Sequence, residues 1–353
     1  MDEPVHILIT GAAGQIGYIL TFSIANGSLF GSNKKIFLHL LEIPVAMKAL
    51  NAIVMELNDC NYPNLVGIIA THNVQEAFSG IDIAFLVGTF PKKPKMSLES
   101  YIECNGVIFK EHGLALSNYA KKTVKVLIVG TPVCTNTLVC MHYASSLDAS
   151  HFSALTLLDH NRIVSELAQH LSIHHSRLHK VCIWGNRSAT QVPDISHATY
   201  DIDPSHPIPI LSKKDSHEIL EEGRGLVSEI VEEGYPNEVA ENLSFHTTHL
   251  TRARGGVAAS GAHAAVQHMK YWLFGTPEGE FISMAIPVPE NEPYGIKKGV
   301  VYSFPCTVDQ NGNIHVVENL DLSEEIRSKI VQNETEIREE ANIAAQLLNF
   351  ELE

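Results

Sequence analysis

The first 150 residues alternate short apolar runs with longer amphipathic segments. The apolar runs, each predicted to be a buried strand, are Val5–Ile9, Ile36–Leu41, Ile81–Val87 and Val124–Val129. The amphipathic segments, each predicted to be a helix, are Gln15–Asn26, Pro44–Asn58 and Leu98–Lys121. Continuous apolar strands separated by helices are typical of a parallel sheet that is covered on both faces. The pattern therefore predicts a doubly wound α/β domain over residues 1–150.

The second half of the chain has a more mixed pattern. Helices are predicted at Asp159–Leu171, Lys214–Glu233, Ala258–Phe274 and Leu322–Asn349. Strands are predicted at Lys180–Trp184, Phe281–Pro287, Gly299–Pro305 and Ile314–Val317, with a hairpin turn at Asp309–Asn313. We therefore expect an α+β domain over residues 151–353.

Composition and charge exclude several classes of protein. The chain is 45% hydrophobic and 18% charged, which is a globular composition. Its net charge of -15, without a basic block, argues against binding to nucleic acid or to an anionic membrane. The sequence contains no apolar stretch of about 18 residues, and its N-terminus runs directly into a predicted strand without a signal peptide. The six cysteines are scattered, so we expect free thiols and a cytoplasmic protein.

A glycine motif follows the first predicted strand. Gly11, Gly14 and Gly17 have the spacing GxxGxxG and open a predicted helix, whose N-terminal amides favour a pyrophosphate. Glu42 ends the second predicted strand, where a carboxylate accepts hydrogen bonds from a ribose and repels a 2′-phosphate. The combination predicts a Rossmann domain that binds NAD in preference to NADP. The alternative is a glycine turn that binds no ligand.

Several segments resemble the cytosolic malate dehydrogenase family over nearly the whole chain. They read ITGAAGQIGY, MELNDC, DHNR, IWGN, WLFGTPEGEF and YSFPC. The stretch from HMKYWLF to YSFPC looks especially like the malate/lactate dehydrogenases of trichomonad protists. The resemblance implies a homodimer with an N-terminal Rossmann domain and a C-terminal substrate domain, and with Met55–Cys60 in the dimer interface.

The resemblance also assigns roles to individual residues. Asp159 would hold a catalytic histidine, and Arg162 would bind a substrate carboxylate. The implied cofactor-binding residues are Gly11, Gly14, Gln15, Ile16, Gly17, Glu42, Gly88, Asn105, His112 and Gly130. No metal site is implied. His175 and His179 have an i,i+4 spacing that could bind a metal, but a solvated helix end is the simpler interpretation.

Four substrate-site positions depart from the family pattern. Arg187 stands where the family has its catalytic histidine, and arginine cannot accept a proton near neutral pH. The family has arginine at the positions of Lys92 and Leu98, and asparagine at that of Thr131. We expect Arg187 to pair with Asp159 and to fill part of the substrate pocket. His160 and His112 are alternative bases.

Two interpretations follow from these departures. The first is a catalytically impaired, NAD-binding homodimer that serves as a scaffold, in the cytoplasm or in a larger cytoskeletal or axonemal assembly. The second is an active NAD-dependent malate (2-hydroxyacid) dehydrogenase with an unusual site. The acidic segment 215–242 is either a solvated helix with an extended loop or a docking surface.

Overall fold

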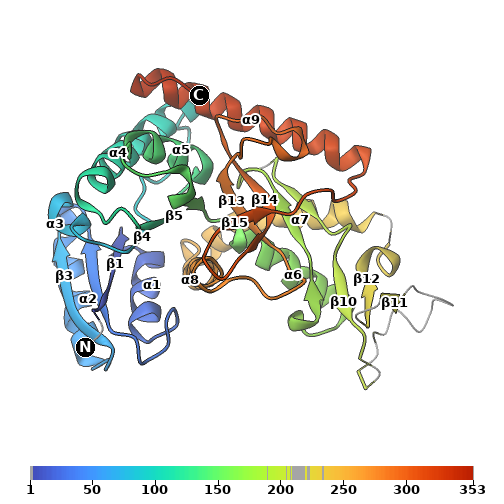
Figure 1. Ribbon diagram of the computed structural model, residues 1–353, viewed down its shortest axis with the longest axis horizontal. Helices are drawn as coiled ribbons and strands as arrows, with labels where there is room; N and C mark the ends of the chain where they lie inside the picture. Colours follow the sequence, from blue (N-terminus) through green and yellow to red (C-terminus); the bar gives the residue numbers. More distant parts are fainter. Residues whose placement is uncertain are drawn as a thin grey trace.

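One sheet of nine strands joins the two halves of the molecule (Figure 1). The computed structural model describes residues 3–352 except 189, 204, 207, 209–218, 221–222 and 233. Within that part the strand order is β15-β14-β13-β6-β5-β4-β1-β2-β3. The parallel strands are β1 (Val5–Thr10), β2 (Ile36–Leu41), β3 (Leu65–Thr71), β4 (Ile83–Leu86), β5 (Lys125–Ile128) and β6 (Phe152–Ala154). Their order is that of a Rossmann domain.

Successive residues of the parallel strands enter separate cores on the two faces of the sheet. On β1, Ile7 and Ile9 pack on one face with α1 (Gln15–Ala25), whereas Leu8 packs on the other. The second face is covered by α4 (Leu98–Tyr119) and α5 (Val133–Tyr143). The remaining helices of this half are α2 (Met47–Asp59) and α3 (Val74–Phe78). Burial on both faces explains why these strands are continuously apolar.

The C-terminal half adds antiparallel strands to the same sheet. β13 (Ile282–Pro287) pairs with β14 (Val301–Val308), which pairs with β15 (Ile314–Val316). β13 meets β6 through a single residue pair, Ala285 opposite Ala154. Two smaller sheets lie outside this one, with the order β11-β12-β10-β7 and β8-β9. Their strands are β7 (Leu178–His179), β8 (Cys182–Trp184), β9 (Val192–Asp194), β10 (Thr199–Asp201), β11 (Ile219–Leu220) and β12 (Arg224–Leu226).

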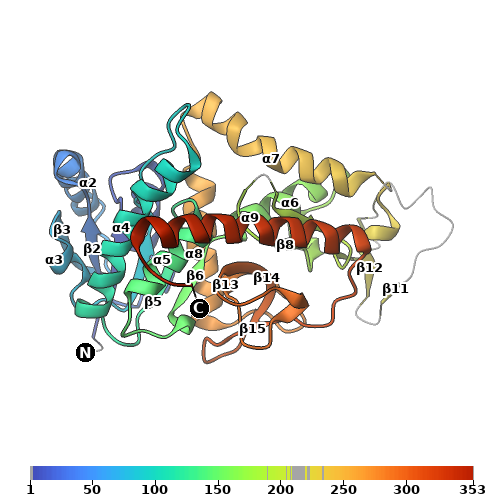
Figure 2. The same ribbon diagram turned by 90° about the horizontal axis from the view of Figure 1, so that it is seen from above.

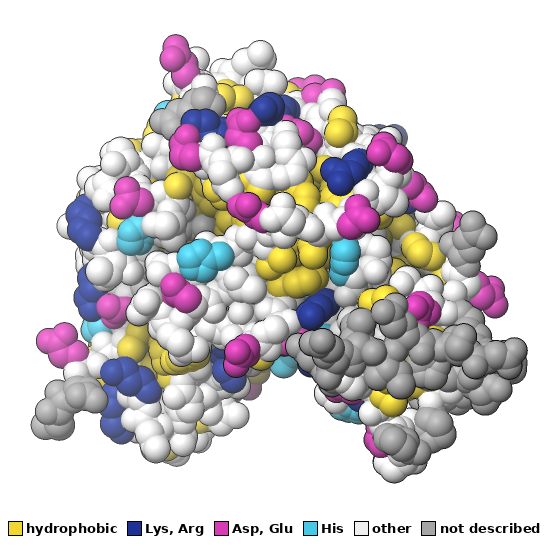
Figure 3. Space-filling model, turned by 45° about the vertical axis from the view of Figure 1, so that its right-hand side comes forward, with side chains coloured by type: hydrophobic (Ala, Val, Ile, Leu, Met, Phe, Trp, Pro, Cys, Tyr) yellow, Lys and Arg dark blue, Asp and Glu magenta, His cyan; other side chains and the backbone are white. Residues whose placement is uncertain are grey.

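Four helices complete the C-terminal half. They are α6 (Leu157–Leu171), α7 (Tyr235–Arg254), α8 (Ala259–Phe274) and α9 (Glu324–Leu348). Helix α9 crosses both halves of the molecule (Figure 2) and brings Leu348 into the core beside α4 and α5. Figure 3 shows acidic side chains spread over the visible face among basic ones, so the net charge of -15 does not gather there into one patch.

Most predicted elements are present, and the α/β class with a Rossmann sheet and a second α/β domain is confirmed. The helix predicted at Lys214–Glu233 is wrong in its described part, which contains β11, β12 and a 3₁₀ turn at Val227–Glu229. Residues 214–218, 221, 222 and 233 of that prediction, most of which also belong to the acidic segment 215–242, lie outside the described residues. Helix α7 begins within the second half of that segment, and the sequence pattern did not predict it. The elements α3, α5, β3, β6, β7, β9 and β10 were also missed.

Candidate cofactor and substrate site

The glycine loop between β1 and α1 packs too closely for side chains. Gly11 has φ +63°, and a Cβ atom there would lie 2.6 Å from the Cα atom of Gly88. A Cβ atom at Gly17 would lie 2.2 Å from the carbonyl oxygen of Gly11. The loop therefore needs glycine at both positions. Its backbone and the N-terminus of α1, which follows Gly14, suit a pyrophosphate group.

Polar contacts fix the loop to the strands around it. Glu42 Oε1 accepts a hydrogen bond from the Ala13 amide at 2.9 Å, and Oε2 accepts one from the Ile43 amide at 3.0 Å. Thr10 Oγ1 accepts hydrogen bonds from the amides of Val87 and Gly88. The carboxylate expected to bind a ribose therefore also holds the glycine loop in register with β2.

Other predicted cofactor residues act through the backbone or through packing. Gly130 accepts a hydrogen bond from Asn136 Nδ2 at 2.9 Å, and a Cβ atom there would lie 2.2 Å from Thr89 Cγ2. The side chain of Gln15 approaches Gly256, and that of Ile16 approaches Gly261 near the start of α8. Their side chains thus join the two domains.

The side chains of two predicted cofactor residues are buried in the protein core. Asn105 is fully buried, and its amide bonds the backbone of Phe90 and of Tyr101. His112 is 5% exposed and packs against Phe78 and Phe109. Burial lowers the pKa of His112 to about 4. Both side chains contact other parts of the protein core, and their role toward the cofactor stays a prediction.

Asp159 on α6 lies between two arginines, as the sequence led us to expect for Arg187. Arg162 Nη1 donates a hydrogen bond to Asp159 Oδ1 at 2.7 Å. Arg187 Nε lies 2.9 Å from Asp159 Oδ2. The carboxylate is 1% exposed: Arg162 hydrogen-bonds Oδ1, whereas Arg187 faces Oδ2 as an ion pair without hydrogen-bond geometry, and the two positive charges offset the cost of burying it.

Arg162 retains a free donor. Its Nη1 also bonds Thr247 Oγ1 at 2.8 Å, whereas its buried Nη2 has no partner among the described residues. Burial lowers the pKa of Arg162, an effect that Asp159 opposes and Arg187 reinforces. An unpartnered guanidinium nitrogen in a buried setting favours an anionic ligand. Sequence reasoning missed Thr247, because no motif marks it.

The other altered positions surround Tyr101. Tyr101 donates a hydrogen bond to the carbonyl of Thr131 at 2.7 Å and lies 3.1 Å from Thr131 Oγ1. Lys92 Nζ lies 5.7 Å from the centroid of the Tyr101 ring. Leu98 is the first residue of α4 and is 37% exposed. The carbonyl and the hydroxyl of Thr131 are thus both in contact with the Tyr101 hydroxyl. Neither Lys92 nor Leu98 carries the guanidinium group that the family has at these positions.

Helix α9 supplies three side chains that sequence reasoning missed. Asn333 Oδ1 accepts a hydrogen bond from the Asn186 amide at 2.9 Å, and Glu340 Oε2 accepts one from Asn186 Nδ2 at 3.3 Å. Glu336 accepts hydrogen bonds from Ser188 and Thr190. Burial raises the pKa of Glu340, while its bond from Thr135 lowers it. These contacts fix the loop that carries Arg187.

A Rossmann sheet with a glycine loop and an acidic residue after the second strand defines a dinucleotide-binding protein. Residues 5–153 match the lactate/malate dehydrogenase NAD binding domain, and residues 156–347 match the lactate/malate dehydrogenase alpha/beta C-terminal domain. The chain belongs to the lactate/malate dehydrogenase family, and NAD is the cofactor of its N-terminal domain.

Individual relatives are similar over almost their full length. The cytoplasmic malate dehydrogenase of Echinococcus granulosus is 41% identical over 345 residues, which are 98% of each chain. The Trichomonas vaginalis lactate dehydrogenase in complex with NADH and oxamate has a TM-score of 0.89 and 42% identity, with 98% of this chain and 99% of that chain covered. The malate dehydrogenase of Naegleria fowleri has a TM-score of 0.87 and 34% identity, with 98% and 99% covered.

Two kinds of feature are absent from the described residues. Among them, no helix is both long and apolar enough to cross a membrane. The same part of the chain contains no group of three or more His, Cys, Asp or Glu side chains arranged to hold a metal ion. All six cysteines are free thiols, as expected.

Proposed function

We propose that this chain is an NAD-binding member of the family whose dehydrogenase reaction is impaired. The observation that carries the proposal is the ion pair between Arg187 and Asp159, at 2.9 Å. Malate oxidation needs a base for the hydroxyl proton, and a guanidinium group has no acceptor nitrogen. Each oxygen of Asp159 already lies within 2.9 Å of an arginine nitrogen, so the charge of the carboxylate is neutralised within the protein.

The remaining residues retain binding without completing the reaction. NAD would supply the hydride acceptor, with the glycine loop and Glu42 holding it. Arg162 retains a free donor for one substrate carboxylate. Leu98 cannot bind a second carboxylate, and Thr131 is already bonded to Tyr101. Loss of a general base typically costs roughly 10²–10⁴-fold in rate, and poorer positioning adds to that loss.

A turnover assay tests the proposal. The purified full-length protein is incubated with NADH and with oxaloacetate or pyruvate, and NADH absorbance is followed. NADH binding is measured in parallel by calorimetry. We expect NADH to bind and turnover to be negligible. Turnover at ordinary enzyme rates, about 1–10³ s⁻¹, would show that another residue is the base.

The second candidate function is an active malate (2-hydroxyacid) dehydrogenase. Arg162 with its free Nη2 favours it, because this donor fits the carboxylate of such a substrate. The 41% identity to a cytoplasmic malate dehydrogenase also favours it. The same assay separates the two candidates, since only this one predicts oxidation of NADH by oxaloacetate at enzyme rates.

We further propose that the chain forms a homodimer through the region of α2. Large apolar side chains are exposed there in the single chain: Ile43 (61%), Val45 (88%) and Met55 (68%). An interface between two copies would remove them from water. Light scattering at micromolar concentration should give twice the mass of one chain, and the mass of one chain would contradict the proposal.

A family member that has lost its catalytic base can still serve as a scaffold, because it keeps its fold and its bound cofactor. We propose this role in the cytoplasm, within a larger assembly such as a cytoskeletal or axonemal one. Its support is the altered substrate site alone. Native size-exclusion chromatography of a cell extract tests it, because elution of all the protein as a free dimer would contradict an assembly.

A further inference from the structure

A cavity of about 550 Å³ lies in the C-terminal half, and neither the glycine loop nor Asp159 lines it. It is bounded by the small sheet that contains β10 and β12 and by segments next to β13, β14 and β15. Its volume is in the range of small-molecule sites. None of its lining residues belongs to the cofactor and substrate site described above.

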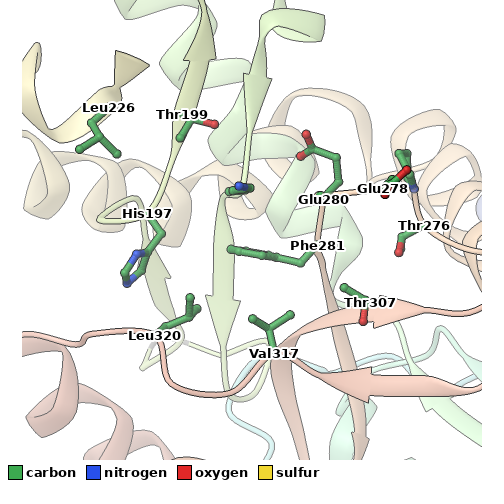
Figure 4. Close-up of a pocket in the computed structure, with 13 residues that line it drawn as sticks. His197, Thr199, Leu226, Thr276, Glu278, Glu280, Phe281, Thr307, Val317 and Leu320 are labelled. Atoms are coloured by element: carbon green, nitrogen blue, oxygen red, sulfur yellow. The ribbon is translucent and has the colours of Figure 1, made fainter. Parts of the chain in front are cut away.

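One side of the cavity is apolar. In Figure 4 the Phe281 ring extends across its middle, with Leu226 above and Val317 and Leu320 below. Phe281 is 7% exposed, so its ring is held in place by the core. These side chains form a surface for an aliphatic or aromatic group.

Glu278 and Glu280 also line the cavity, above and to the right of the Phe281 ring in Figure 4. Glu280 Oε1 lies 2.6 Å from Arg224 Nη1 and 3.1 Å from His179 Nδ1. Asp201 Oδ1 contacts the same two side chains, at 3.0 Å from His179 and 3.2 Å from Arg224. The hydrogen bond from His179 lowers the pKa of Glu280 against the effect of burial. The charge of Glu280 is therefore balanced within the protein.

Two charges that line the cavity have no ion-pair partner among the described residues: Glu278 and Lys180. Lys180 has φ +56°, a backbone conformation that is costly for a residue with a side chain. Thr199, which also lines the cavity, is 2% exposed, and its hydroxyl has no described partner. A partly buried cation, Lys180, and an exposed carboxylate, Glu278, thus border one cavity with an apolar side, and the buried Thr199 hydroxyl lies beside it.

We propose that this cavity binds a free amino acid with an apolar side chain. The ligand carboxylate would pair with Lys180, its ammonium group with Glu278, and its side chain would pack on Phe281. Both unpaired charges are then satisfied by a ligand without net charge. A purely cationic or purely anionic ligand would satisfy only one of them. Binding at this cavity does not depend on dehydrogenase turnover. If the proposed function fails, the proposed binding of an amino acid is unaffected.

Calorimetry on the full-length protein with L-phenylalanine tests the proposal. We expect saturable binding at millimolar ligand. The amine 2-phenylethylamine and the acid 3-phenylpropionate should each bind at least about tenfold more weakly, because each loses one charge-assisted hydrogen bond. Absence of saturable binding of L-phenylalanine would overturn the proposal, and so would equal affinity for the three compounds.

The variant Lys180→Gly tests whether L-phenylalanine binds in this cavity. It removes the ammonium group and relieves the positive φ, so the variant should fold at least as well as the wild type. We expect it to bind L-phenylalanine at least about tenfold more weakly. Lys95→Gly is the matched control, because Lys95 also has a positive φ (+65°) and does not line the cavity. Unchanged binding in Lys180→Gly, or equal losses in both variants, would contradict this site.

Discussion

Arg162 and Arg187 approach one buried carboxylate, Asp159, from its two oxygens. Two guanidinium groups and one carboxylate leave a net positive charge where the family resemblance places a histidine that gains its charge only during the reaction. A permanent cation favours an anion in this pocket at every pH at which the fold survives. We therefore expect an inorganic anion such as phosphate or sulfate to compete with any 2-oxo acid.

At the scale of the residue, the first prediction concerns rescue of activity. Arg187→His alone should restore little oxidation of NADH, because Lys92, Leu98 and Thr131 still misplace the substrate. Arg187→His combined with Lys92→Arg, Leu98→Arg and Thr131→Asn should restore measurable oxidation with oxaloacetate. The gain expected from the base is roughly 10²–10⁴-fold. It is measured as kcat/KM in a steady-state assay.

The control is the same combination with Arg187 retained. It keeps the new carboxylate-binding groups without a base, and it should stay close to the wild type. Full activity in this control would show that positioning alone was lacking and that a base other than residue 187 operates.

The Arg187–Asp159 ion pair was predictable because the resemblance puts both residues at one site. Thr247 and Glu340 were not predictable. They lie on α7 and α9, which are far from α6 in the sequence, and only the folded arrangement brings their side chains to Arg162 and Asn186. The burial of His112 was also beyond the sequence, since a histidine on an amphipathic helix is compatible with either face.

At the scale of the element, the glycine loop gives the second prediction. Gly17→Ala should weaken NADH binding at least about tenfold, because its Cβ atom would lie 2.2 Å from the carbonyl oxygen of Gly11 and displace the loop. Fluorescence titration of NADH measures the change. Gly234→Ala is the control, since a Cβ atom there meets nothing within 4 Å. Unchanged affinity in Gly17→Ala would mean that the cofactor does not use this loop.

Helix α9 gives the third prediction. Asn333 is fully buried and bonds both the Asn186 amide and Thr190. Asn333→Ala leaves these groups unsatisfied and should lower the free energy of unfolding by about 1–3 kcal/mol. Asn342→Ala on the exposed side of the same helix should change it by less than about 0.5 kcal/mol. Urea denaturation followed by circular dichroism compares the two, and equal effects would contradict the role of Asn333.

The sequence predicted helices and strands correctly where burial determines the pattern of apolar residues. It failed where pairing with a strand distant in the sequence determines the structure. The strands β1 and β2 are apolar throughout because both faces of the sheet are covered. The segment Lys214–Glu233 has a helical spacing of apolar residues, yet β12 within it pairs with β10. Gly225 permits that pairing, since a Cβ atom there would lie 2.4 Å from the Tyr200 ring. Local periodicity contains no information about such a partner.

At the scale of the whole molecule, buried histidines give the fourth prediction. Burial lowers the pKa of His39, His112 and His160 from 6.5 to about 4, and that of His268 to about 3. In the unfolded chain each would gain a proton below about pH 6.5, whereas in the fold each stays neutral until about pH 4. The unfolded state binds more protons in this window, so stability falls as the pH falls through it.

Each such histidine should lower the free energy of unfolding by about 2 kcal/mol at about pH 5 relative to neutral pH. Denaturation in urea at both pH values measures the loss. His112→Gln should reduce the loss by about that amount, whereas the exposed His72→Gln should leave it unchanged. A stability that is flat over this range would contradict the burial of these rings.

The position of Leu348 in the core beside α4 and α5 has a consequence for biosynthesis. The Rossmann strands are synthesised first, but α9, which completes one of the helical layers that shield them, follows only after the C-terminal half. Until then the hydrophobic surface of α4 and α5 stays open to water and to other nascent chains. The N-terminal domain therefore cannot complete its packing until α9 has been synthesised.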